Sequence, residues 1–146
     1  MELVIFSGIP ASGKSTFYSE RLRSSHSVVS LDLVKTREAE NDLFSDVIKR
    51  GEKVVVDNTN PLVEDRARYI VLARAAGYTI FGYQFEIPVK TALARNSKRT
   101  RRVPPVAIMA INKKMVDLCY SEGFDRIYIV SSRSACTVRI KPFNTP

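Results

Sequence analysis

The sequence predicts an α/β fold, a three-layer sandwich in which helices cover both faces of a mainly parallel, five-stranded sheet. Two patterns predict it: short apolar runs typical of buried strands, and apolar stripes of helical period between those runs. Parallel strands need crossover helices and are buried on both faces, which accounts for both patterns. Ligands of such folds bind at the carboxyl ends of the strands, so the residues after each run are the first candidates for a functional site.

Five apolar runs are the candidate strands, and each has the composition of a buried strand. In chain order they are residues 2–8 (ELVIFSG), 26–32 (HSVVSLD), 53–59 (KVVVDNT), 78–86 (YTIFGYQFE) and 126–131 (RIYIVS).

Three stripes of helical period lie between the candidate strands. The first comprises Leu43, Phe44, Val47 and Ile48. The second follows the helix-starting Pro61 and comprises Val63, Ala67, Ile70, Val71 and Arg74. The third comprises Ile108, Ile111, Met115, Leu118 and Cys119.

Length and composition predict one domain over residues 1–146, because 45% hydrophobic residues are enough to build a core. The only histidine is His26, which argues against His-rich zinc sites and His-based hydrolytic dyads. Cys119 and Cys136 lack metal-ligand spacing, and the start of the chain lacks a charged leader. No apolar run approaches the roughly 20 residues that span a bilayer. We therefore expect an intracellular, cytoplasmic protein with reduced thiols, no disulfide partner and no membrane partner.

The positive charge is concentrated in one segment. Residues 87–116 hold eight Lys or Arg and no Asp or Glu, and five of these basic residues lie within residues 95–102. The rest of the chain carries 15 basic and 15 acidic side chains, so this segment accounts for the whole net charge of +8. Such asymmetry predicts an anionic partner that the protein meets at one face.

Residues 8–16 (GIPASGKST), termed here the phosphate loop, follow the first run and match G-x-x-x-x-G-K-[ST] in full. Glycines let such a loop fold with its backbone N–H groups toward phosphate oxygens, and the helix that begins near Lys14 adds its positive end. Lys14 can then reach the β and γ phosphates, and the Ser15 hydroxyl can bind Mg²⁺. The loop predicts a site for ATP and Mg²⁺ whose contacts are Gly8, Ala11, Ser12, Gly13, Lys14, Ser15 and Thr16.

Two aspartates follow the second and third runs, so both are expected beside the phosphate loop. Asp32 ends VVSLD and Asp57 ends VVVD. In phosphoryl transfer one carboxylate positions the acceptor hydroxyl and takes its proton, while another can hold a magnesium-bound water. The alternative is that either aspartate is an ordinary strand-end cap, and part of the NTNP sequence after Asp57 is expected to be capping and turn chemistry.

Together these motifs resemble the 5′-hydroxyl polynucleotide kinase domain of phage polynucleotide kinase and of the animal DNA-repair kinase-phosphatases. The similarity rests on GIPASGKST, an Asp after the second run, VVVDNTNP followed by RARYIVLARAAGY, and RNSKR before a proline-led helix. It covers about residues 1–120, in order and with compatible spacing. The resemblance implies an adenylate-kinase-like P-loop NTPase fold with a helical lid over about residues 95–105.

The resemblance also implies roles for individual residues. Lys14 and Ser15 match the phosphate-loop pair, Asp32 matches the general base that activates the 5′-hydroxyl, and Asp57 matches an active-site aspartate that supports the site.

Arg95 and Arg99 match the two lid arginines of that family. They lie four residues apart and therefore on one helical face, where two guanidinium groups can clamp ATP and stabilise the transferring phosphoryl group. We expect Lys98, Arg101 and Arg102 to face the solvent or a strand backbone instead.

The sequence departs from the family pattern beside Asp32. Family members often have an Arg before this aspartate and another three residues after it, the latter touching the substrate phosphate, whereas here the positions hold Leu31 and Lys35. Lys35 offers a point charge to a substrate without a bidentate fork. DxDxT, the phosphatase signature of the bifunctional relatives, is absent.

The resulting hypothesis is an ATP-dependent kinase that transfers the γ-phosphoryl group to a hydroxyl, with the 5′-OH end of DNA or RNA as its first candidate. One alternative is a P-loop kinase for a small metabolite, nucleoside or antibiotic. The other is a non-catalytic, nucleotide-dependent binding module in which Asp32 is only a cap. The basic segment favours a long anion, but a lid over a triphosphate would carry similar charge.

Overall fold

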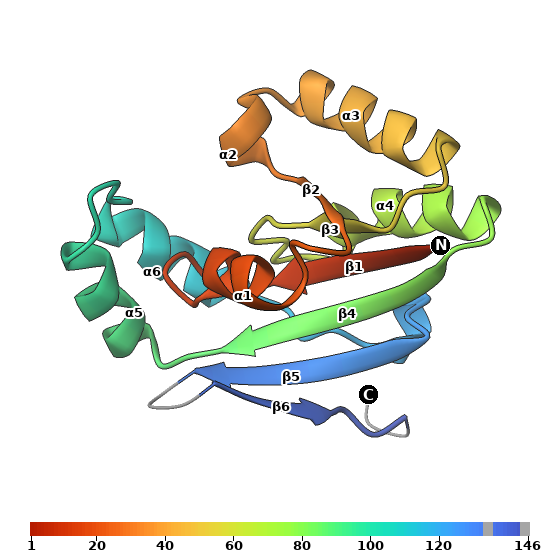
Figure 1. Ribbon diagram of the computed structural model, residues 1–146. Coiled ribbons are helices and arrows are strands. Elements are labelled where there is room, and N and C mark those ends of the chain that lie inside the picture. The colour runs from red at the N-terminus through yellow and green to blue at the C-terminus, as the bar shows by residue number, and fades with distance from the viewer. Residues whose placement is uncertain (133–135, 144–146) are drawn as a thin grey trace.

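The computed structural model describes residues 1–132 and 136–143, and within them the sheet has six strands in the order β2-β3-β1-β4-β5-β6 (Figure 1). The strands are β1 (Glu2–Ser7), β2 (Ser27–Val29), β3 (Val54–Val56), β4 (Thr79–Glu86), β5 (Arg126–Ser132) and β6 (Cys136–Ile140). The first five strands are parallel to one another. The predicted α/β class and the five predicted strands are confirmed.

The expected total of five strands is wrong, because β6 adds an antiparallel edge strand beside β5. Tyr128 of β5 pairs with Ile140 of β6, and Val130 pairs with Val138. Every side chain of β6 is exposed. The five residues of β6 (CTVRI) do alternate apolar and polar side chains, but the segment is short and was not singled out from the sequence.

The helices are α1 (Lys14–Arg21), α2 (Leu31–Val34), α3 (Arg37–Lys49), α4 (Val63–Ala75), α5 (Val89–Ser97) and α6 (Pro105–Lys114), with a 3₁₀ turn η1 (Tyr120–Glu122). Figure 1 shows α1 on one face of the sheet and α4 on the other, while α5 and α6 stand beyond the carboxyl end of β4. Among the described residues, no helix combines the length and hydropathy that crossing a membrane requires.

Side chains of β1 alternate between two apolar clusters, one on each face of the sheet. Leu3 and Ile5 pack with α3 and α4, whereas Val4 and Phe6 pack with Phe17 of α1. All four β1 side chains are buried. The central strand therefore fixes both layers of helices, as expected for a parallel strand covered on both faces.

The first and third predicted stripes are confirmed in part. Phe44 and Val47 of α3 are buried, and Leu43 and Ile48 pack against them. In the third stripe Ile108 is buried within α6, but α6 ends at Lys114. Leu118 follows as extended chain and reaches the central core instead of continuing the helix.

The predicted buried face of α4 is only partly right, because Ile70 is buried as expected but the valines are not. Val63 and Val71 are 42% and 66% exposed, and the helix instead buries Arg66 and Tyr69 together with Ile70 and Ala73. Arg66 pairs with Glu122 of η1, with its Nε 2.8 Å from Oε1. Tyr69 donates its hydroxyl to the buried Glu40 carboxylate of α3. Polar side chains can occupy the buried face because each has a hydrogen-bonding partner there.

The close contact of Gly82, in the centre of β4, with Leu118 and Phe124 leads to a testable prediction. A Cβ at this position would lie 2.7 Å from Leu118 Cδ1 and 2.9 Å from Phe124 Cε1. We expect Gly82→Ala to lower the free energy of unfolding by about 1–3 kcal/mol, because both neighbours must shift within a packed core. Chemical denaturation measures this, with Thr79→Ala at an exposed position of the same strand as the control. Equal stability of the two variants would contradict the packing of Leu118 on β4.

Candidate active site

The carboxyl ends of the parallel strands open into a cleft of about 670 Å³. Its lining includes phosphate-loop residues 10–16, Asp32 from α2, Asp57 from the end of β3, and Arg95 and Arg99 from the lid (residues 95–105). The structure therefore brings together most of the residues that the sequence singled out. Gly8 and Lys35 are not among the described lining residues.

The phosphate loop takes its shape from backbone conformations that few residues adopt. Gly13 has φ +96° and is the N-cap of α1, and Ala11 has φ +64°. The left-handed turn at Gly13 starts α1 at Lys14, as predicted, and no side chain caps this helix end. The amide groups of the first turn are therefore left for an anion, and the helix dipole favours one.

Gly8, the first residue of the phosphate loop, packs against the neighbouring strand β4 and bonds to the exit of β3. Its N–H donates to the carbonyl oxygen of Thr59 at 3.0 Å, so this amide is already used within the protein. A Cβ at Gly8 would lie 2.8 Å from Phe85 Cβ, which is closer than such atoms approach. Glycine is required here by the close packing of β1 against β4, and its predicted nucleotide contact stays a prediction.

The Lys14 ammonium is buried and folds back over the phosphate loop. Its Nζ donates to the carbonyl oxygens of Gly8 at 3.0 Å and Ile9 at 2.8 Å. Burial is the main reason why the pKa of Lys14 falls to about 8; the carboxylates of Asp57 and Asp32 oppose this change, and the Arg99 charge adds to it. An anion bound in the loop would favour the charged ammonium.

Ser15 and Asp57 meet beside the phosphate loop, where the Ser15 hydroxyl donates to Asp57 Oδ2 at 2.8 Å. Burial raises the pKa of Asp57, against the opposing effects of the Ser15 hydrogen bond and of Lys14. A hydroxyl and a carboxylate are oxygen ligands of the kind Mg²⁺ takes, with phosphate oxygens and waters completing its shell. This pair fits Mg²⁺, and no group of three His, Cys, Asp or Glu forms an alternative site within the described residues.

The exit segment, residues 57–61 after β3, links the phosphate loop to the neighbouring strands. The Asn60 amide donates to the carbonyl oxygen of Phe6 at 2.8 Å, and the Ser7 hydroxyl donates to the carbonyl oxygen of Asn60 at 3.0 Å. The Asn60 backbone is left-handed, with φ +42°. This segment thereby fixes the end of β1, from which the phosphate loop departs.

Asn58 in the same segment positions α2, the helix that carries Asp32. Its Oδ1 accepts from the backbone N–H of Leu31 at 3.0 Å, and its Nδ2 donates to the buried carboxylate of Glu40. The expected capping role of NTNP is met at α2, where Asn58 binds the first N–H group, and not at α4, where Leu62 is the N-cap and donates its N–H to Asp65 Oδ2 at 3.0 Å. The polar side chains of Asn58 and Asn60 find long-range partners instead.

Asp32 lies in the first turn of α2, with its carboxylate at the rim of the cleft and 81% exposed. The helix is capped by Ser30, whose Oγ accepts from the Asp32 N–H at 3.2 Å. Because Ser30 fills the cap position, the Asp32 carboxylate has no part in capping α2. Its one ion pair in the described residues is with Arg101 of the lid, at 3.8 Å between Oδ1 and Nη2.

The lid is closed at its base by Asn96, a buried residue that the sequence analysis did not single out. Its Nδ2 donates to the carbonyl oxygen of Val103 at 2.7 Å, and its Oδ1 accepts from the Val103 N–H at 3.0 Å. The only signal in the sequence is a short amide side chain within a basic run. This clamp fixes the loop that holds Arg99 and Arg101. The expectation that Arg95 and Arg99 share one helical face is wrong, because α5 ends at Ser97 and Arg99 follows in the loop.

The other basic residues near the cleft differ in position. Lys98 and Arg102 are exposed, as predicted, and the Arg102 Nε donates to the carbonyl oxygen of Arg99 at 3.1 Å. Lys35 ends α2 with a left-handed backbone, φ +73°, and its side chain is exposed. Its predicted contact with a substrate stays a prediction.

Comparison with known proteins places this site within a family. Residues 3–118 match AAA_33, a family of AAA domains. The chain is 31% identical over 102 residues to a bifunctional polynucleotide phosphatase/kinase of Schizosaccharomyces pombe, covering 69% of this chain and 23% of that protein. It is 32% identical over 139 residues to a putative bifunctional polynucleotide phosphatase/kinase of Acanthamoeba polyphaga mimivirus, covering 89% of this chain and 33% of that protein. The chain thus spans a third or less of the length of these curated relatives.

Solved structures with the same fold include P-loop kinases. Kti12 of Chaetomium thermophilum, solved with ADP-AlF3, has a TM-score of 0.67 at 16% identity, with 88% of each chain covered. A gluconokinase of Sinorhizobium meliloti has a TM-score of 0.62 at 14% identity, covering 89% of this chain and 82% of that one. At these identities the likeness shows the fold alone, and it confirms the predicted P-loop class.

The lowered pKa of Lys14 leads to a prediction about nucleotide binding. At about pH 9 most of the buried ammonium is deprotonated in the free protein, and phosphate oxygens that replace the loop carbonyls would raise its pKa again. Binding of MgATP is therefore expected to take up close to one proton at about pH 9 and almost none at about pH 7. Calorimetric titration in buffers of different ionisation enthalpy measures this uptake. Identical uptake at the two pH values would contradict the assignment of Lys14 to the phosphates.

Proposed function

Because this chain belongs to the AAA_33 family and has the fold of a P-loop kinase, we propose that it is an ATP-dependent kinase that phosphorylates the 5′-OH end of DNA or RNA. One observation carries the proposal: a single cleft holds the phosphate loop, the exposed carboxylate of Asp32 and two lid arginines. The polynucleotide phosphatase/kinases to which the chain is similar support the choice of acceptor. We further propose that the chain is one kinase domain with an intracellular location.

The proposed mechanism assigns each side chain a step. Asp32 accepts the proton of the acceptor hydroxyl, whose oxygen attacks the γ-phosphorus in line with the leaving β-phosphate oxygen. Lys14 exchanges the loop carbonyls for phosphate oxygens and neutralises their charge. Arg99, which lies near enough to Lys14 to affect its pKa, stabilises the charge of the transferring group from the lid.

Asp57 and Ser15 contribute oxygen ligands at the edge of the phosphate loop. Mg²⁺ bound there would neutralise phosphate charge during transfer. Asp57 is partly buried, and its carboxylate accepts the hydrogen bond that orients the Ser15 hydroxyl. Asp57 therefore supports the site, while Asp32 at the open rim is the residue that a polymeric acceptor can reach.

The openness of the rim favours a polynucleotide over a small metabolite. An enclosed pocket suits a metabolite because most of a small ligand's surface must be buried for binding. Here the Asp32 carboxylate is 81% exposed, and the neighbouring lid residues 98–102 are all exposed. A strand end can enter such a rim while the rest of the strand extends into solvent beside a basic surface.

The acceptor is tested by incubating the protein with labelled ATP, Mg²⁺ and a panel of 5′-OH oligonucleotides, nucleosides and sugars. We expect phosphorylation of the oligonucleotides, with a KM that rises with salt because each phosphate contact contributes about 0.7 to the log–log slope for a single strand. An oligonucleotide carrying a 5′-phosphate is the matched control and must remain unlabelled. Transfer to nucleosides or sugars alone, or an oligonucleotide KM insensitive to salt, would instead support the metabolite kinase.

Replacing the proposed base separates an enzyme from a nucleotide-dependent binding module. Asp32→Asn keeps the size of the side chain, and α2 retains its Ser30 cap, so we expect the affinity for ATP and the stability to change little. The rate of transfer to the acceptor is expected to fall about 100-fold or more, as for loss of a general base. Single-turnover kinetics and nucleotide binding measure the two effects. A variant that loses stability while keeping its turnover rate would make Asp32 a structural residue.

A further inference from the structure

The side of the cleft formed by α2, where Asp32 would meet the acceptor hydroxyl, has no basic residue in its described lining. Among the described residues that line the cleft, the basic ones are Lys14, Arg95 and Arg99. Lys14 lies over the phosphate loop, and Arg99 is close enough to lower its pKa. Beside Asp32, Leu31 is apolar and Lys35 lies outside the lining. A negatively charged acceptor that reached Asp32 would find no cation on α2 facing the cleft.

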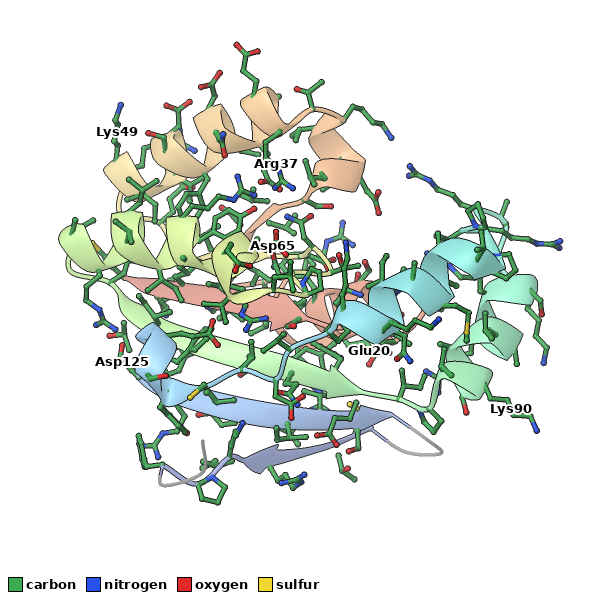
Figure 2. All side chains as sticks on the ribbon, turned by 180° about the vertical axis from the view of Figure 1, so that it is seen from behind. Glu20, Arg37, Lys49, Asp65, Lys90 and Asp125 are labelled. Atoms are coloured by element: carbon green, nitrogen blue, oxygen red, sulfur yellow. The ribbon has the colours of Figure 1, made fainter. Side chains whose placement is uncertain are left out.

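Arg101 supplies positive charge to this side from the lid. Its guanidinium lies 3.8 Å from the Asp32 carboxylate, and both side chains are largely exposed, at 67% and 81%. Figure 2 shows the lid loop and α2 facing each other, as does Figure 1 from the other side. An exposed ion pair at this separation contributes little stability, so an incoming anion can readily take the guanidinium from Asp32.

The lid loop directs Arg99 and Arg101 to different parts of the cleft. Asn96 bonds both polar groups of Val103 and closes the base of the loop, while the Arg102 Nε bonds the carbonyl oxygen of Arg99 within it. Arg99 lines the cleft and affects Lys14, whereas Arg101 contacts Asp32. Arg101 is exposed, as expected, but it also pairs with Asp32.

We propose that Arg101 binds the first internucleotide phosphate of the acceptor strand, an inference that rests on the proposed polynucleotide kinase function. When the 5′-hydroxyl is hydrogen-bonded to Asp32, the nearest acceptor anion is the phosphate on the 3′ side of the same sugar. A guanidinium can fork onto two oxygens of that phosphate. Such a contact reads no base, so it selects a strand over a nucleoside without selecting a sequence.

The matched variants are Arg101→Gln and Lys98→Gln, which remove the same charge from exposed positions of the same lid. A charge-assisted hydrogen bond contributes about 1.5–3 kcal/mol, or roughly ten- to a hundredfold in KM. We expect Arg101→Gln to raise KM for a 5′-OH oligonucleotide by this factor. KM for ATP and kcat are expected to stay close to wild type, and Lys98→Gln to change KM for the oligonucleotide less than threefold.

A pair of minimal acceptors isolates the phosphate: a nucleoside, and the same nucleoside carrying a 3′-phosphate. Wild type is expected to prefer the 3′-phosphorylated acceptor, Arg101→Gln to lose that preference, and Arg101→Lys to keep part of it. If Arg101→Gln affects both acceptors equally, or no more than Lys98→Gln does, Arg101 is not the phosphate contact although the kinase proposal stands. If wild type phosphorylates neither the oligonucleotide nor the 3′-phosphorylated nucleoside, the proposed function fails and this inference fails with it.

Discussion

The geometry of the active site depends on the hydrogen bonds of the exit segment after β3. The strand β3 lies between β2 and β1, so the residues that leave its carboxyl end can reach both neighbours. On one side Asn60 and Thr59 bond to the end of β1 and to Gly8, and on the other Asn58 bonds to the start of α2. Asp57 adds the bond to Ser15. One segment of five residues thereby sets the position of the phosphate loop relative to Asp32, which any phosphoryl transfer between bound groups requires.

The buried carboxylate of Glu40 connects the exit segment to the helices α3 and α4. Glu40 of α3 is fully buried and accepts hydrogen bonds from Asn58, Tyr69, Arg37 and Arg68. Burial raises the pKa of Tyr69, and the hydrogen bond to Glu40 and the charge of Glu40 add to this effect. Removing one partner of such a group leaves a charge or a donor unpaired in the interior, which costs far more than the intact network contributes. The placement of α2 is thus tied to the packing of α3 on α4.

The basic residues of the lid point to different parts of the cleft and its surroundings. The lid carries most of the basic residues of the segment that accounts for the net charge of +8, yet their positions differ. Arg99 acts on Lys14 and the phosphate loop, Arg101 reaches Asp32, and Lys98 and Arg102 stay exposed. The Asn96 clamp makes this division possible, because a fixed loop presents neighbouring residues to different sides of the cleft. The net charge predicts only that the protein attracts anions. The positions of Arg99 and Arg101 in the fixed loop determine where an anion would bind.

Local patterns were sufficient to predict the α/β class, the parallel strands, the start of α1 at Lys14 and the presence of Asp32 and Asp57 in the cleft, although Asp32 lies in α2 and not at the end of a strand. Each depends on a spacing within a few neighbouring residues or on the rule that parallel strands end at one edge. The buried face of α4 was not predictable in this way, because the burial of Arg66 depends on distant partners such as Glu122, 56 residues later, and that of Tyr69 on Glu40. The edge strand β6 carries no burial pattern, and the contact between Arg101 and Asp32 joins two segments far apart in the chain. A sequence pattern records which side chains avoid water, whereas the partner that lets a polar group be buried, or draws a charge across a cleft, is decided by the tertiary structure.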